Sequence, residues 1–512
     1  MALALALRLP GLFWGLPGPT HLFSYHPDEF HSLRGALSFA QGDLNPHFLN
    51  YGCLYLYAVA GTCAAAHPSL MAAVAQTPAA LPRALRTWTA DARLVSLVAG
   101  LATVAAVALA AQALGGHGLW AALALALMPL HSLHCRYATV DVTLALFVAL
   151  AVWATARGQA RPALYVWAGV FAGLAASTKY TGAVVLAAPL VALAVDGGLP
   201  AGRRAGLAAA CAGAALLAFA VTSPYVLLAW QEAGRDVLFE MRHMRVGESP
   251  AREAEPWGPW FHLKWLTLGT GGLALAGLIG MAMAAAAGDR ERRWLPVAVL
   301  AAILVVMISA TGVRYARYEL PLLPLAALGV GWLGALGRRG ATAVLTALMA
   351  LAAVHCVTIC VQLTRPDSRD LALRELVQRS EADQSVGMPW QPWFQGPPVD
   401  YCNGGEALRR NPLWAGFSRE LRQLVVTGYD AGALGDGGPD WFSLGEVEDR
   451  DFRRAGQATP FWQALEAHYE VVAEWHQGSL AGLAPRALNP PQDWLYPVMP
   501  LKLMRQRSGL SG

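Results

Sequence analysis

Two adjacent carboxylates, Asp28 and Glu29, lie in an early polar stretch that reads SYHPDEFHSLRG. A carboxylate that faces a hydroxyl group can take up its proton as the oxygen attacks an electrophile, which is general-base catalysis. Acidic residues in the first turn of a helix also stabilise the helix dipole, and residues 30–41 have the apolar spacing of an amphipathic helix. From the residues alone, the two interpretations have equal weight.

Basic residues at three later places carry the opposite charge. Arg136 precedes Asp141 in RYATVD, Lys179 lies in STKYTG, and Arg314 and Arg317 lie in RYARYELPLLP. Arginine binds phosphate oxygens in pairs, and lysine neutralises them as a point charge. Any one of these side chains could instead extend from a membrane helix toward lipid headgroups. As a group, they predict a cationic cradle for a phosphate leaving group beside an anionic base.

The composition indicates which kind of protein must position these residues. The chain has 512 residues, of which 55% are hydrophobic and only 14% are charged, whereas a soluble domain carries about a quarter charged residues. Most charges fall between apolar runs or after Thr364. This pattern predicts a multi-pass membrane protein with one polar domain. The net charge of +4 is too small and too scattered to indicate a nucleic-acid partner.

Apolar runs of sufficient length predict about eleven membrane spans. The first run is short and is interrupted by Arg8 and Pro10, and residues 29–75 are better explained by interfacial or re-entrant helices. The expected spans lie near residues 1–16, 92–114, 118–134, 140–156, 163–178, 180–196, 204–228, 264–287, 294–311, 318–336 and 340–363.

The arginine clusters predict the orientation of these spans. They lie at residues 157–161, 203–204, 290–293 and 338–339, in connections that fall on one side of the predicted bundle. The positive-inside rule makes that side cytoplasmic. The early carboxylates, the later basic residues and the C-terminal segment are then extracytoplasmic, in a cell inner (plasma) membrane.

Residues 365–512 predict a small extracytoplasmic α/β domain of about 145 residues, which is within the usual size of a domain. The segment RPDSRDLALRELVQRS reads as a helix with Asp367 as its N-cap and Asp370 in its first turn. Strands are expected at residues 424–429, 469–475 and 498–504. Residues 1–364 form the predicted all-α membrane domain.

The order of several motifs resembles a known superfamily. HPDE, GDLNPHF with NYGCLYLY, RYATVD, STKYTG and RYARYELPLLP follow one another as in the GT-C fold glycosyltransferases. Within these, the chain is most similar to the protein mannosyltransferases that use dolichyl-phosphate mannose and to the bacterial lipid A aminoarabinose transferases. The resemblance covers residues 1–363. Two features depart from the family pattern: the first span is short, and Gly52 follows Tyr51 where proline is usual.

The resemblance implies an inverting transfer of a hexosyl or pentosyl group from a polyprenyl-phosphate donor to a hydroxyl group of a glycan, lipid or protein. It implies catalytic roles for Asp28, Glu29 and Asp141, with Asp28 preferred as the base. Phosphate binding would fall to Lys179 and to Arg314 or Arg317, and less directly to Arg136. The alternatives are a transporter or flippase of a lipid-linked or anionic solute, and a GT-C-like polymer ligase.

No cofactor is indicated by the sequence. His26, His31 and His47 share the early loop with Asp28, so a divalent metal is a lesser alternative. However, the three histidines lack the close helical spacing of a metal site. The seven cysteines contain no CxxC pair, so neither a zinc site nor a disulfide framework is indicated.

Overall fold

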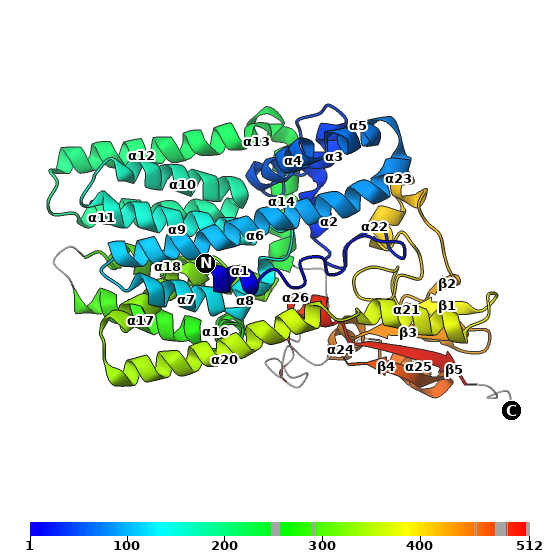
Figure 1. The fold of residues 1–512 in the computed structure, drawn as a ribbon. Helices are drawn as coiled ribbons and strands as arrows, with labels where there is room; N and C mark the ends of the chain where they lie inside the picture. Colours follow the sequence, from blue (N-terminus) through cyan, green and yellow to red (C-terminus); the bar gives the residue numbers. More distant parts are fainter. Residues whose placement is uncertain are drawn as a thin grey trace.

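The structure is a computed structural model that describes residues 1–246, 257–288, 292–454, 456, 458–476, 488 and 490–507. A helical bundle occupies most of the chain, and a small sheet lies at one end of it (Figure 1). The elements of the bundle are α1 (Ala2–Ala6), α2 (Glu29–Ser32), α3 (Arg34–Ala40), α4 (Leu54–Ala66), α5 (Pro68–Gln76), η1 (Pro78–Ala80), α6 (Leu81–Ala113), α7 (Gly118–Leu127), α8 (Pro129–His134), α9 (Asp141–Gly158), α10 (Leu164–Thr178), η2 (Tyr180–Leu186), α11 (Ala187–Val195), α12 (Ala201–Thr222), α13 (Pro224–Leu228), α14 (Trp230–Val246), α16 (Gly258–Leu268), α17 (Leu273–Ala287), α18 (Leu295–Ser309), η3 (Ala316–Glu319), α19 (Leu322–Ala335) and α20 (Arg339–Leu363).

Several helices are apolar and long enough to cross a membrane. Within the described residues, four helical stretches meet this criterion, and six do if each of two bent pairs counts as one span. Five further apolar helices have 10–17 residues. The bundle is therefore that of a multi-pass membrane protein, although the expected number of eleven spans is not confirmed.

Proline and glycine explain why several predicted spans are broken. The run predicted at 118–134 divides into α7 and α8 at Pro129, and the run at 264–287 divides into α16 and α17, which are bent by 109°. Gly271 and Gly272 both have positive φ at this second bend, a conformation that glycine adopts without a Cβ penalty. The helices α4 and α5 are bent by 101°, as expected for a re-entrant or broken pair.

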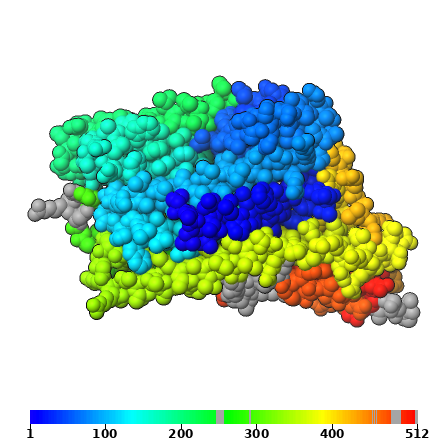
Figure 2. Space-filling model, in the orientation of Figure 1, coloured from blue at the N-terminus to red at the C-terminus, as the bar shows by residue number. Residues whose placement is uncertain are grey.

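The predicted span over residues 1–16 is not formed as a helix. Only Ala2–Ala6 is helical, and the chain then continues through turns that contain Pro10 and Gly11. This N-terminal segment lies along one face of the bundle as a dark blue band between α6 and α20 (Figures 1 and 2). The buried Arg8 side chain holds it there through hydrogen bonds to the carbonyl oxygens of Leu125 and Ala126, at 3.3 and 3.1 Å.

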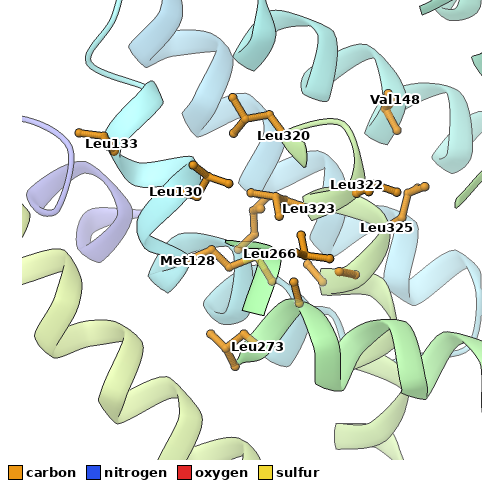
Figure 3. Close-up of a cluster of buried hydrophobic side chains, with 14 of the residues drawn as sticks. Met128, Leu130, Leu133, Val148, Leu266, Leu273, Leu320, Leu322, Leu323 and Leu325 are labelled. Atoms are coloured by element: carbon orange, nitrogen blue, oxygen red, sulfur yellow. The ribbon is translucent and has the colours of Figure 1, made fainter. Parts of the chain in front are cut away.

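Large aliphatic side chains form the core of the bundle. Met128, Leu130 and Leu133 from the α7–α8 region meet Leu266, Leu273 and the leucines of LPLLPL at residues 320–325 (Figure 3). This packing fixes the segment that directly follows η3. Because η3 carries Arg317, the core determines where that guanidinium group can reach.

The second part of the chain is an α/β unit. Its strands form a five-stranded sheet in the order β2-β1-β3-β5-β4, in which β1 runs parallel to β2 and β3 whereas β5 runs antiparallel to β3 and β4. The boundary that we propose after residue 364 falls between α20 and α21. The elements of the α/β unit are α21 (Ser368–Arg379), β1 (Ser385–Met388), α22 (Gly405–Arg409), α23 (Pro412–Ala415), β2 (Gln423–Val426), η4 (Ala431–Leu434), β3 (Trp441–Gly445), α24 (Glu446–Arg454), α25 (Thr459–His468), β4 (Tyr469–Trp475), α26 (Gln492–Leu495), η7 (Tyr496–Val498) and β5 (Leu501–Gln506).

The ends of the helices divide the bundle into two sides. The connections α9–α10, α11–α12 and α19–α20, which carry predicted cytoplasmic arginines, lie at the end of the bundle away from the sheet (Figure 1). The helix α2 lies at the opposite end, toward the sheet (Figure 1), and η3 contacts α26 of the α/β unit.

Candidate active site

Three of the residues predicted from the sequence line one pocket. Asp28, Asp141 and Arg317 come from segments far apart in the chain, and they line one small pocket that is partly open to solvent. The other residues that line it are His31, Ser32, Phe48, Tyr51, Leu56, Thr139 and Val140.

Asp28 lies at the start of α2, where its backbone N–H donates to His26 Nδ1 at 3.3 Å. Its carboxylate Oδ2 accepts a hydrogen bond from Arg317 Nη1, so the pair joins the first loop to η3. Burial alone would raise the pKa of Asp28, but the charge and hydrogen bond of Arg317, together with His26 and His31, outweigh burial and lower the pKa to about 2. The carboxylate therefore stays ionised at neutral pH and has a bound counter-ion.

Asp141 and Lys179 form the second charged pair. Asp141 is the first residue of α9, and Lys179 directly follows the last residue of α10. The neighbouring helices α9 and α10 thus bring Lys179 Nζ to 2.9 Å from Asp141 Oδ1. Lys179 Nζ also lies over two aromatic rings, 5.7 Å from the centre of Tyr51 and 4.9 Å from that of Tyr318. These rings support the ammonium group through cation–π contacts.

Glu29 faces away from this pocket. Its two carboxylate oxygens accept hydrogen bonds from Arg93 Nε and Nη2, both at 2.7 Å, and Oε1 also accepts the Ala138 N–H at 2.9 Å. Both charged side chains of the pair are fully buried. This geometry favours a structural role in which Glu29 fixes α2 against α6, beside the carboxylate of Asp28.

The structure also separates Arg136 and Arg314 from the pocket. The Arg136 guanidinium is buried and donates to the carbonyl oxygens of Pro10, Ser132 and Leu7, which ties the N-terminal segment to α8. Arg314 is half-buried near the start of α16 and is not among the residues that line the pocket. Among the predicted phosphate ligands, Lys179 and Arg317 are the two that contact the pocket carboxylates.

Several pocket residues were not among the predicted catalytic or phosphate-binding residues, although His31 was considered as a metal ligand. The Thr139 Oγ1 and His31 Nδ1 atoms are buried and have no hydrogen-bond partner within the described residues, so both are available to a ligand. Thr139 lies in the RYATVD motif and Tyr51 in NYGCLYLY, so membership of these motifs could have indicated both as site residues. Arg93 lies in a predicted span, where an ionisable residue indicates a buried partner or a function.

No metal site is formed among the residues that the structure describes. No group of three or more His, Cys, Asp or Glu side chains is placed to hold an ion there. His47 instead pairs with Asp43 and Glu232, at 2.8 and 3.0 Å, and its side chain is exposed.

Comparison with known proteins extends this description. Residues 66–230 match the family model of the dolichyl-phosphate-mannose-protein mannosyltransferases, a stretch that contains Asp141 and Lys179. No protein among those with curated functions matches the sequence.

The fold is also that of solved glycosyltransferases. ArnT from Cupriavidus metallidurans, solved both bound to undecaprenyl phosphate and in the apo state, superposes with a TM-score of 0.50 at 16% identity, over 98% of this chain and 96% of that chain. The Archaeoglobus fulgidus oligosaccharyltransferase gives a TM-score of 0.47 at 12% identity, over 93% of this chain and 72% of that one. The family match and the ArnT likeness agree with the resemblance in the motifs: the chain has the GT-C glycosyltransferase fold.

Proposed function

We propose that the chain is a membrane glycosyltransferase that moves a sugar from a polyprenyl-phosphate donor to an acceptor hydroxyl group, with inversion at the anomeric carbon. The observation that supports this most is the pocket in which Asp28, Asp141 and Arg317 meet, with Lys179 held on Asp141. It combines a carboxylate base with two cations that suit a phosphate. That ArnT was solved with undecaprenyl phosphate bound supports a donor of this class.

The ion pairs suggest how donor binding prepares the base. A carboxylate with a pKa of about 2 is a weak base, because general-base catalysis works best when the pKa of the base is near the working pH. A donor phosphate competes with Asp28 for Arg317 and with Asp141 for Lys179. As Arg317 turns to the phosphate, Asp28 loses its counter-ion and its pKa rises. Binding of the donor thus activates the base.

The transfer step then follows from the charges. Asp28 takes the proton of the acceptor hydroxyl group as its oxygen forms a bond to the anomeric carbon. The bond from that carbon to the phosphate oxygen breaks on the opposite face, and its electron pair stays on the phosphate. Arg317 and Lys179 stabilise the charge that develops there, and such preorganised charges contribute strongly to catalysis.

The arrangement of the bundle supports an extracytoplasmic site. The helix α2, which directly follows Asp28, lies toward the sheet, and the connections with the predicted cytoplasmic arginines lie at the opposite end (Figure 1). By the positive-inside rule the pocket and the α/β domain then face out of the cell. The acceptor, whether glycan, lipid or protein, would reach the pocket from that side.

The test measures carrier release by the purified protein in liposomes. With mannosyl, glucosyl and aminoarabinosyl polyprenyl phosphates and a membrane extract as acceptor, we expect at least one donor to release polyprenyl phosphate with time. Asp28→Asn should lower the rate about 100-fold or more, the usual contribution of a general base. Asp43→Asn is the matched control, because Asp43 lies in the same loop and its partner is the exposed His47. Full activity in Asp28→Asn, or donor movement without carrier release, would contradict the proposal.

A further inference from the structure

Arg317 is held from its backbone as well as from its guanidinium group. The backbone N–H groups of Ala316 and Arg317 open the short helix η3, where no residue of the helix can accept them. Both donate to the carboxylate of Asp493, at 3.3 Å to Oδ1 and 2.9 Å to Oδ2. Asp493 belongs to α26 of the α/β domain, which lies between the sheet and the bundle (Figure 1).

The helix α26 is itself fixed on the bundle. The buried Trp494 ring lies against Gly269, where an added Cβ would come within 2.8 Å of the ring, and its centre is 6.2 Å from that of Trp265. Tyr315, whose ring lies 4.4 Å below the Arg317 guanidinium carbon, donates its hydroxyl hydrogen to Gln492 at 3.4 Å. The α/β domain therefore contacts both the backbone of η3 and Tyr315, the residue over whose ring the Arg317 guanidinium group lies.

An aspartate at the buried position 493 costs free energy of folding. Asp493 is fully buried, and no basic side chain within the described part of the chain forms an ion pair with it. Burial raises its pKa to about 6, although the charge of Arg317 and the backbone N–H groups lower it. A buried carboxylate without an ion-pair partner still costs free energy when two N–H groups solvate it, whereas a neutral oxygen could accept one N–H at less cost. Such a departure from local stability is common where function determines the residue.

The geometry points to Asp493 as a positioning residue of the transferase: the α/β domain uses this carboxylate to set the backbone from which Arg317 reaches the donor phosphate. The inference rests on the proposed function for the identity of the ligand. Its physical basis is that two anchored N–H groups fix the Arg317 Cα, so that the guanidinium group can exchange Asp28 for phosphate without the loop moving. The α/β domain is then part of the donor site.

Hydrogen exchange tests the anchoring without any assay of activity. Asp493→Asn keeps the size of the side chain but leaves one N–H without an acceptor, because the amide nitrogen cannot accept it. We expect the peptide that contains Ala316 and Arg317 to exchange faster in this variant. Asp440→Asn is the matched control, since Asp440 accepts the Ser385 N–H at 2.8 Å elsewhere in the same domain. If Asp493→Asn gives too little folded protein, Asp493→Ser replaces it.

Binding of undecaprenyl phosphate tests the link to Arg317. We expect Asp493→Asn to weaken binding by about tenfold, the equivalent of one charge-assisted hydrogen bond. In the double variant that combines Asp493→Asn with Arg317→Gln, the loss of affinity should not exceed that of Arg317→Gln alone. Substitutions of residues that act through one another do not have additive effects on the binding free energy. Additive losses, or unchanged exchange at Ala316 and Arg317, would overturn the inference. If the unmodified protein neither binds undecaprenyl phosphate nor releases carrier, the proposed function fails, and the exchange experiment still decides the role of Asp493.

Discussion

At the scale of single residues, the neighbouring carboxylates of Asp28 and Glu29 have different hydrogen-bond partners. Asp28 is paired with Arg317, which in the proposed mechanism moves to the donor phosphate, whereas Glu29 accepts three hydrogen bonds from Arg93 and the Ala138 N–H. Removing one partner of a fully buried ion pair leaves an unpaired charge, which is far more destabilising than removing both. Glu29 and Arg93 should therefore behave as a pair in stability.

Arg93→Met is expected to lower the stability of the protein by about 3–5 kcal/mol, because the Glu29 carboxylate is left without a counter-ion. The double variant Glu29→Leu with Arg93→Met should recover much of this loss. Thermal unfolding in detergent measures both as shifts in Tm. Equal Tm values in the single variant and the unmodified protein would show that the pair has no structural role.

The residues alone could predict which residue types gather, but only the family resemblance preferred Asp28 to its neighbour Glu29 as the base. Asp28, Asp141 and Arg317 were predicted as site residues and lie together. The phosphate-binding role expected for Arg136 has no support in the geometry, because its guanidinium group is occupied by backbone carbonyl oxygens. Those carbonyls belong partly to an N-terminal segment that does not form the expected helix. No local pattern around residue 136 could reveal them.

At the scale of elements, close helix packing positions Lys179. The helix α10 ends directly before Lys179, and it meets α12 through Gly169 and Gly173, where an added Cβ would lie 2.1 and 2.2 Å from the carbonyl oxygens of Cys211 and Ala215. Small residues four apart allow membrane helices to approach closely, since no hydrophobic effect drives their association within the bilayer. A larger residue there must move the end of α10.

Gly173→Ala should therefore lower the Tm and weaken binding of undecaprenyl phosphate, because separation of α10 from α12 moves Lys179 from the pocket. Gly213→Ala is the matched control, since it lies on α12 with open space around its Cβ position. Binding assays and thermal unfolding on both variants provide the comparison. An equal effect of the two substitutions would mean that close packing at Gly173 does not position Lys179.

At the scale of the whole molecule, long apolar runs predicted the helical bundle well, whereas only some of the strands were predicted. The strands β2, β4 and β5 overlap the expected runs, and Asp367 caps α21 as predicted, accepting the Arg369 N–H at 2.9 Å. β1 and β3 were missed because almost all of their residues are buried. Such strands lack the alternation that indicates a sheet.

The bend between the helices α16 and α17 was also not predicted from the sequence. Hydropathy over 20 residues does not respond to a single bend, so α16 and α17 were expected as one span although they meet at 109°. Contacts between distant segments were also beyond the sequence. The hydrogen bonds from η3 to Asp493 join residues that are 176 or more apart in the chain, and only the folded structure brings them together.

The proposed mechanism depends on an exchange in which the donor phosphate takes Arg317 from Asp28. Affinity for undecaprenyl phosphate in the unmodified protein, Asp28→Asn and Arg317→Gln tests it most directly. Loss of the competing carboxylate should make Asp28→Asn bind more tightly, even though it no longer catalyses transfer, and Arg317→Gln should bind about tenfold more weakly or worse. Weaker binding in both variants, or no change in either, would contradict the exchange of partners on which the mechanism depends.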